Sequence, residues 1–236
     1  MKNKLSKPKM SSNLKYERTE KFRRKILMTT HYFAGYISVE NAQIISGYTN
    51  IGAKKALKNL VAEKFLTENK ISIFGTSRLI YRITKRGREY ISQYSEYEKD
   101  NPYYETFKLA RFRPSTFNHE MTVQRLAHEL SEKLETDFYK AVALGATKNK
   151  KGFLVGGRRA DAEFIYKDNR SFLEVELSMK SRKRYESIFE IYNRYDATVF
   201  WAIRKKKTHI FKQIMDELLD IEFKSKHLII DLEDDY

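Results

Sequence analysis

Three carboxylates stand close together in a stretch that has the pattern of two β-strands joined by a short turn. Asp161 begins one run of alternating apolar residues, and Glu174 and Glu176 lie in the next, with a polar Lys-Asp-Asn turn at 167–169 between the runs. Such a turn is typical of a hairpin, which can bring Asp161 beside the two glutamates on one face of a sheet. Because three neighbouring carboxylates repel one another unless a cation lies among them, the pattern predicts a Mg²⁺ or Mn²⁺ site.

The charge of the chain indicates what such a metal would act on. The 236 residues include 46 Lys and Arg against 31 Asp and Glu, a net charge of +15, and the pI is about 9.7. Residues 1–100 carry 21 basic and 9 acidic side chains, whereas residues 101–236 carry 25 and 22. A polyanion, above all nucleic acid, is the expected partner, and the first part of the chain is the expected contact surface.

The composition also excludes several classes of protein. The chain has no cysteine, which excludes disulfides and thiolate metal sites. The basic N-terminal stretch lacks the continuous apolar segment of a signal peptide, and no run approaches the roughly 20 apolar residues that span a bilayer. We therefore expect a soluble, cytoplasmic protein without a membrane partner, and we expect residues 1–18 to be a basic flexible tail.

A regular helical pattern begins at Thr19. Apolar residues at helical spacing fill 21–33, and Ser38 then precedes a short helix that ends near Gly47. After a Gly-containing turn, residues 51–66 have apolar residues on one face of a helix and lysines on the opposite face. Two short helices joined in this way, the second with a basic outer face, indicate a helix-turn-helix.

Two β-runs follow the second helix and meet at 74–78, and a further helix begins in the segment YRITKRGREYI. A hairpin directly after a recognition helix is the wing of a winged-helix domain, which we place at 19–95. The alternative is a winged helix that contacts only protein, with its lysines as solvated surface. The residues expected to contact DNA are Thr49, Asn50, Lys54, Lys55, Lys58 and Arg78.

The second half of the chain has a different pattern. Residues 96–116 are rich in Tyr and polar residues and are the expected linker. An amphipathic helix is predicted at 117–134, strands near 139–144, 160–166, 171–177 and 197–203, helices at 181–195 and 209–219, and a last strand at 227–231. The order of helix, three strands, helix and strand predicts a restriction-endonuclease-like (PD-(D/E)xK) α/β domain at 117–236. The chain as a whole is thus predicted to have two domains, one α+β and one α/β.

Several segments resemble the replication-relaxation family, which includes the MOBC-class relaxases of mobilisable plasmids and integrative conjugative elements. The similar segments are HEMTVQRLAHEL, RRADAEFIY, FLEVELSMKSRKRY and YDATVFWAI, and the likeness covers roughly residues 20–205 because that family also has an N-terminal winged helix. The resemblance implies a metal-dependent endonuclease that recognises duplex origin DNA and nicks one strand during conjugation, plasmid mobilisation or DNA replication. Other relaxosome or coupling proteins would be its partners, besides the nicked or single strand.

The resemblance also implies roles for individual residues. Asp161, Glu174 and Glu176 would bind Mg²⁺ or Mn²⁺, and Lys180 would lie near the scissile phosphate. His119 or Glu120 would add a ligand or position the water. The chain departs from the nuclease pattern at Ala160, where proline is common, and at Glu176, where many members have a catalytic lysine.

Other interpretations of the same residues stay open. Glu174 and Glu176 could form the solvated face of an edge strand, paired with Arg158, Arg159 or Lys180. One of Tyr185, Tyr192 and Tyr195 could act as a covalent nucleophile. The chain could also be a non-catalytic DNA-binding relaxosome accessory or replication regulator with a degenerate nuclease fold, or an endonuclease that cuts both strands.

Overall fold

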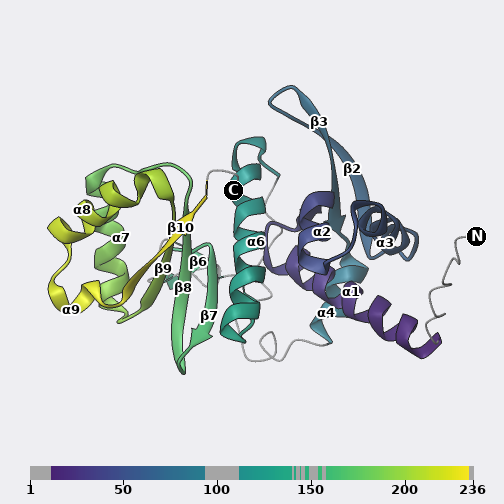
Figure 1. The fold of residues 1–236 in the computed structure, drawn as a ribbon, viewed down its shortest axis with the longest axis horizontal. Helices are drawn as coiled ribbons and strands as arrows, with labels where there is room; N and C mark the ends of the chain where they lie inside the picture. Colours follow the sequence, from purple (N-terminus) through teal and green to yellow (C-terminus); the bar gives the residue numbers. More distant parts are fainter. Residues whose placement is uncertain are drawn as a thin grey trace, which may run out of the picture. The chain divides into compact units, whose positions relative to one another are not determined.

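The chain folds into helices together with a three-stranded and a five-stranded sheet, a mixed α+β structure (Figure 1). The computed structural model describes residues 12–93, 112–139, 141, 144, 147–148, 154–155 and 158–233. The described residues form two compact units. One contains residues 12–31, 35–71 and 79–93, and the other contains residues 32–34, 72–78 and the described residues from 112 onward. Most of the predicted linker lies outside the described residues.

The N-terminal part has a helix, a short strand, two further helices, a hairpin and a last helix. Its elements are α1 (Ser12–Tyr32), β1 (Tyr36–Ser38), α2 (Val39–Ser46), α3 (Asn50–Ala62), β2 (Leu66–Ile73), β3 (Thr76–Ile83) and α4 (Lys85–Ser92). The strands form a sheet in the order β1-β3-β2. The hairpin turns at Phe74 and Gly75, which both have positive φ, so the two β-runs meet where the sequence predicts.

The turn between α2 and α3 is set by local capping. The Ser38 hydroxyl accepts the Asn41 N–H (3.1 Å) at the start of α2, and Gly47 ends that helix in the left-handed conformation with φ 67°. Thr49 then begins α3, since its Oγ1 accepts the Gly52 N–H (3.2 Å). The predicted cap at Ser38 and the predicted end near Gly47 are therefore confirmed.

The first helix begins earlier than predicted. α1 starts at Ser12, inside the segment 1–18 that was expected to be a flexible tail, while residues 1–11 lie outside the described residues. Charged and polar residues dominate 12–21, so the apolar stripe from Phe22 onward gave no sign of the preceding turns. Long polar side chains are compatible with a helix, and polarity alone does not distinguish such a helix from a tail.

The second unit contains a five-stranded sheet with helices before, between and after its strands. Its elements are η2 (Pro114–Thr116), α6 (Phe117–Leu134), β4 (Phe138–Tyr139), β5 (Thr147–Lys148), β6 (Leu154–Val155), β7 (Ala162–Tyr166), β8 (Asn169–Glu176), α7 (Arg182–Arg194), β9 (Thr198–Arg204), η3 (Lys205–Lys207), α8 (Thr208–Leu218), α9 (Ile221–Lys224) and β10 (His227–Leu232). The predicted helices at 181–195 and 209–219 agree with α7 and α8 to within a residue.

The sheet has the order β10-β9-β8-β7-β4. β7 is antiparallel to both of its neighbours, β4 and β8, whereas β9 runs parallel to β8 and β10 runs parallel to β9. The turn between β7 and β8 consists of Lys167 and Asp168, both with positive φ, which is the geometry of a two-residue type I′ turn. The predicted hairpin is therefore confirmed, and its register pairs Ala162 with Leu173.

Strand β8 is buried along both of its faces. α7 and α8 lie on one side of the sheet and α6 on the other (Figure 1). On the α7 side, an aromatic cluster around Trp201 includes Phe172, Tyr185, Phe189 and Phe211. The residues from Ser171 to Glu176 are consequently buried without alternation, as expected for a central strand covered by helices.

Candidate functional site

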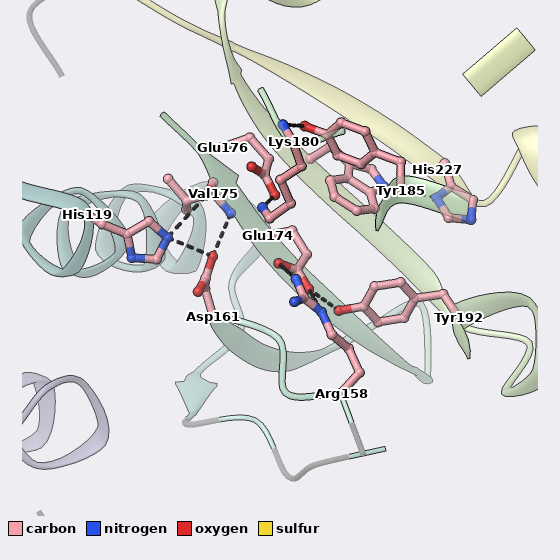
Figure 2. Close-up of polar contacts among 11 residues, drawn as sticks. His119, Arg158, Asp161, Glu174, Val175, Glu176, Lys180, Tyr185, Tyr192 and His227 are labelled. Carbon is pink, nitrogen blue, oxygen red and sulfur yellow. Dashed lines mark hydrogen bonds and ion pairs between the residues drawn. The ribbon is translucent and has the colours of Figure 1, made fainter. Parts of the chain in front are cut away.

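Asp161 lies directly before β7 and is tied to β8 by two hydrogen bonds. Its N–H donates to the Leu173 carbonyl (3.0 Å), and its Oδ2 accepts the Val175 N–H (2.7 Å). These bonds continue the hairpin register by one residue, so Asp161 stands opposite Glu174, as predicted (Figure 2). The side chain of Asp161 retains 21% exposure, which makes it the most accessible of the three predicted carboxylates.

Glu174 is held by a guanidinium and a phenol. Arg158 donates from Nε to Oε1 (3.1 Å) and from Nη2 to Oε2 (2.5 Å), and the Tyr192 hydroxyl also donates to Oε1 (Figure 2). The side chain of Glu174 is only 2% exposed. Burial raises the pKa of this carboxyl, and the charge of Asp161 raises it further, while Arg158 and Tyr192 lower it.

The same contacts act on the pKa values of the two donors. Burial alone lowers the pKa of Arg158, but the charge and hydrogen bonds of Glu174 outweigh burial, so the pKa rises above its ordinary value. Burial raises the pKa of Tyr192 well above its usual value, and Glu174 raises it further. Arg158 is therefore a permanent cation, and Tyr192 is a neutral donor, at the buried end of this cluster.

Glu176 forms an ion pair with Lys180, which follows it on the segment between β8 and α7. The backbone N–H of Lys180 donates to the Tyr185 hydroxyl (3.2 Å), which fixes this segment over the aromatic cluster. Burial lowers the pKa of Lys180 to about 8, although the charge of Glu174 acts in the opposite direction. Glu176 is buried, and its Oε1 atom faces the Lys180 amine rather than solvent.

His119 lies in the first turn of α6 and contacts both Asp161 and the backbone of β8. Its Nε2 lies 3.2 Å from Asp161 Oδ2 and 3.1 Å from the Val175 carbonyl oxygen (Figure 2). Burial by itself lowers the pKa of His119, but the hydrogen bond and charge of Asp161 raise it to about 9, and the charge of nearby Glu120 adds to this. The imidazole is therefore cationic at neutral pH and donates to both oxygens.

Each of the three carboxylates thus has a cation of its own: His119 for Asp161, Arg158 for Glu174 and Lys180 for Glu176. Among the residues that the structure describes, no three His, Asp or Glu side chains lie where together they could hold a metal ion. A Mg²⁺ ion at Glu174 would have to displace a two-bond guanidinium pair. In this arrangement each carboxylate is paired with a cation of the chain itself, which relieves the repulsion that favoured a metal.

The alternative interpretation placed Glu174 and Glu176 on the solvated face of an edge strand, paired with basic residues. It was correct about the basic partners and wrong about the edge strand. Arg158 and Lys180 pair with the two glutamates, as that alternative supposed. However, β8 lies between β7 and β9, and neither glutamate is solvated. The sequence pattern missed this because the parallel return of β9 through α7, which makes β8 a central strand, depends on contacts distant in sequence.

Of the tyrosines considered as nucleophiles, two are buried and one is exposed. Tyr185 and Tyr192 have no measurable exposure, and Tyr192 points into the ion pair of Glu174. Tyr195, at the end of α7, is 46% exposed. The role that the structure gives Tyr192, a hydrogen-bond donor to a buried carboxylate, was not foreseen from the sequence.

The residues predicted to contact DNA divide into caps and exposed cations. Thr49 caps α3, and Asn50 donates from Nδ2 to the Gln43 Oε1 (3.3 Å). Lys54, Lys55 and Lys58 are exposed on α3, and Arg78 is exposed on β3. Sequence reasoning missed Ile51, which is 81% exposed on the side of α3 that carries Lys54 and Lys58. Its helical spacing of three and seven residues from those lysines could have identified it.

In comparisons with models of protein families, with curated proteins and with solved structures, no match was found. No helix in the described ranges is both long enough and apolar enough to cross a membrane.

Proposed function

We propose that this chain is a DNA-binding protein and that its N-terminal part is a winged-helix domain contacting duplex DNA through α3. The element order supports this assignment: a helix, a short strand, two helices joined by a capped turn, a hairpin and a closing helix. In winged-helix proteins the second helix of the turn enters the major groove.

The observation that carries the proposal is the outer face of α3. Ile51, Lys54 and Lys58 are all exposed and lie at helical spacing on one side, opposite the buried residues Ala53 and Leu57. Lysines can neutralise phosphates, and an exposed isoleucine can contact the methyl group of thymine. Ile51, which is 81% exposed on the same side of α3 as these lysines, adds an apolar contact to the basic face.

The charge distribution agrees with this surface. Residues 1–100 hold 21 basic and 9 acidic side chains, so most of the excess positive charge of the chain belongs to the part that contains α3. A potential of this sign attracts DNA over a range set by the salt concentration.

Binding to DNA can be tested with a matched pair of variants. Lys54→Gln/Lys58→Gln removes two charges from α3, and Lys21→Gln/Lys85→Gln removes two exposed charges elsewhere in the same unit. Fluorescence anisotropy with labelled duplex DNA should show at least about a tenfold loss of affinity for the α3 variant and little change for the control. Equal losses would mean that binding depends on net charge alone, and no binding by the unchanged protein would overturn the proposal.

For the second unit we propose a restriction-endonuclease-like fold that takes part in origin recognition without hydrolysing DNA. The order α6-β4-β7-β8-α7-β9, with β9 parallel to β8, supports the fold. Each of the three carboxylates is paired with a cation of the chain, which leaves them less able to bind a catalytic metal. This pairing supports a role without DNA hydrolysis. By its resemblance to the replication-relaxation family, the protein would be a relaxosome accessory or a replication regulator acting at a plasmid or conjugative-element origin.

A second candidate function is nicking of one DNA strand with Mg²⁺ or Mn²⁺. Lys180 favours nicking. Glu176 occupies the strand position where this nuclease pattern has a lysine, and the amine of Lys180 lies beside Glu176. The pKa of that amine is lowered to about 8. The pairing of Glu174 with Arg158 stands against nicking.

Relaxation of supercoiled origin plasmid in Mn²⁺ separates the two functions. The non-catalytic proposal predicts no open circles from the unchanged protein. Open circles that disappear with Asp161→Asn and Glu174→Gln would establish the nickase, and linear product would indicate cleavage of both strands.

A further inference from the structure

The turn of the β2–β3 hairpin has a large aromatic residue where its backbone favours a small one. Two residues, Phe74 and Gly75, connect the strands, and both have positive φ, 47° and 80° (Figure 1). These are the φ values of a type I′ turn, in which Asn, Asp or Gly is preferred at the first position. A bulky side chain with positive φ is uncommon, because its Cβ crowds the backbone. The conformation of the turn therefore gives no reason for a phenylalanine at position 74.

Packing gives no reason for this residue either. The side chain of Phe74 is 80% exposed, whereas that of the adjacent Ile73 is 4% exposed. A Cβ built on Gly75 would have no atom within 4 Å among the residues that the structure describes. Single exposed apolar side chains are ordinary on protein surfaces. A left-handed backbone together with little burial is not, because the conformational cost at Phe74 then has no packing to offset it.

The surroundings of Phe74 suit a polyanion. The polar residues within four positions of it are all exposed, and each carries a hydroxyl group or a positive charge: Lys70, Ser72, Thr76, Ser77 and Arg78. The sequence has no acidic residue from 69 to 88. Hydroxyl groups and cations are the donors that proteins direct at DNA phosphates. The aromatic ring is thus framed by groups that can hold a nucleic-acid backbone.

We propose that Phe74 is an apolar wedge that inserts between two neighbouring base pairs of duplex DNA and bends the duplex. The inference rests on the proposed DNA binding and adds deformation of the duplex to it. Proteins that bend DNA insert phenylalanine and other apolar side chains between base pairs, and the contacts that the bent duplex permits offset the cost of unstacking. A TA step is the expected position, because pyrimidine–purine steps unstack easily.

The two-residue turn also prepares the ring for insertion. A type I′ connection between paired strands has little conformational freedom, and its first residue is held at the end of the hairpin. A side chain presented in this way loses less entropy on binding than one on a flexible loop. The left-handed backbone at Phe74 is therefore part of the proposed function.

Phe74→Asn separates the role of the ring from the stability of the fold. Asparagine removes the ring and is the residue that a type I′ turn favours before glycine. The melting temperature should therefore stay the same or rise by up to about 4 °C. A lower melting temperature would mean that Phe74 supports the fold and would overturn the proposal.

Insertion is measured on a duplex of repeated TA steps in which 2-aminopurine replaces some adenines, and bending on the same duplex with donor and acceptor dyes at its ends. Binding of the unchanged protein should raise 2-aminopurine fluorescence about twofold or more and increase energy transfer between the ends. Phe74→Asn should bind about tenfold more weakly and lose both signals. Phe74→Trp, which keeps a planar ring, should retain them. Ile221→Asn is the matched control, since it removes an apolar side chain in α9 that is 89% exposed, and it should also retain them.

The failure of the wedge and the failure of the proposed function give different results. Duplex binding by the unchanged protein without either signal, or equal signals from Phe74→Asn, would overturn the wedge and leave DNA binding in place. Weaker binding by Phe74→Asn with unaltered signals would place the ring on the outside of the duplex and would also overturn insertion. No duplex binding by the unchanged protein would overturn the proposed function and the wedge together.

Discussion

The guanidinium of Arg158 forms two hydrogen bonds to the carboxylate of Glu174 in the interior of the second unit. Glu174 is 2% exposed and Arg158 is 19% exposed, so the pair is shielded from water on the glutamate side. In such a setting, loss of one partner leaves an uncompensated buried charge, which costs far more than the net contribution of the pair.

Removal of Arg158 alone should therefore be strongly destabilising. We expect Arg158→Ala to lower the free energy of unfolding by about 3–5 kcal/mol, measured by urea denaturation. The double variant Arg158→Met/Glu174→Met should recover most of that loss, because neither charge is then left buried. A cost under about 1 kcal/mol for Arg158→Ala would contradict the buried pair.

The same variant tests whether arginine takes the place that a metal would need. Melting temperatures of the unchanged protein should be the same with and without Mn²⁺. Arg158→Ala should melt about 2–4 °C higher in Mn²⁺, because the freed carboxylates can then bind a cation that stabilises the folded state. Lys183→Ala, an exposed control, should show no such difference. Stabilisation of the unchanged protein by Mn²⁺ would show that the pairs yield to metal.

His227 predicts how stability depends on pH. The Trp201 indole N–H donates to its Nδ1 (2.9 Å), and its Nε2 lies 3.3 Å from the Asn193 Oδ1, so the imidazole is neutral with its proton on Nε2. Burial lowers its pKa from 6.5 to about 4. The unfolded chain therefore binds a proton at a higher pH than the folded chain does, and stability from this group is lost as the pH falls from 6.5 toward 4.

At pH 5 this single group should cost about 2 kcal/mol relative to pH 7.5. Urea denaturation at both pH values measures the loss, and His227→Asn isolates it, because other groups titrate equally in both proteins. Identical pH dependence in the two proteins would show that His227 is not buried in its neutral form.

Gly87 tests the packing of α4 on the hairpin. A Cβ at this position would lie 2.4 Å from the Phe65 carbonyl oxygen and 2.8 Å from Ile83 Cγ1. Because the carbonyl belongs to the backbone and cannot rotate away, Gly87→Ala should destabilise the protein by about 1–3 kcal/mol despite the better helix propensity of alanine. Glu89→Ala on the exposed side of α4 is the control and should change stability by less than about 0.5 kcal/mol.

Local features of the fold could be predicted from the sequence because they depend on neighbouring residues. The cap at Ser38, the left-handed Gly47 and the Lys167–Asp168 turn each follow from side-chain chemistry within a few positions. The proximity of Asp161 to Glu174 followed from that turn, since a two-residue hairpin fixes the register of both strands.

The electrostatics of the candidate site could not be predicted in the same way. Arg158 and Arg159 are adjacent in sequence, and the guanidinium of Arg158, whose backbone forms a bridge with Leu144, pairs with Glu174. Tyr192 reaches Glu174 from α7, and His119 reaches Asp161 from α6. Alternation in the sequence marks carboxylates on one face, but it does not reveal which cations other elements bring to them.

The central claim, that α3 binds DNA, is tested most directly by the salt dependence of binding. The logarithm of the association constant for duplex DNA is plotted against the logarithm of the salt concentration for the unchanged protein, Lys54→Gln/Lys58→Gln and Lys21→Gln/Lys85→Gln. Loss of two phosphate contacts should reduce the magnitude of the slope by about 2 in the α3 variant and leave the control slope unchanged. The same slope for all three proteins would contradict a DNA interface on α3.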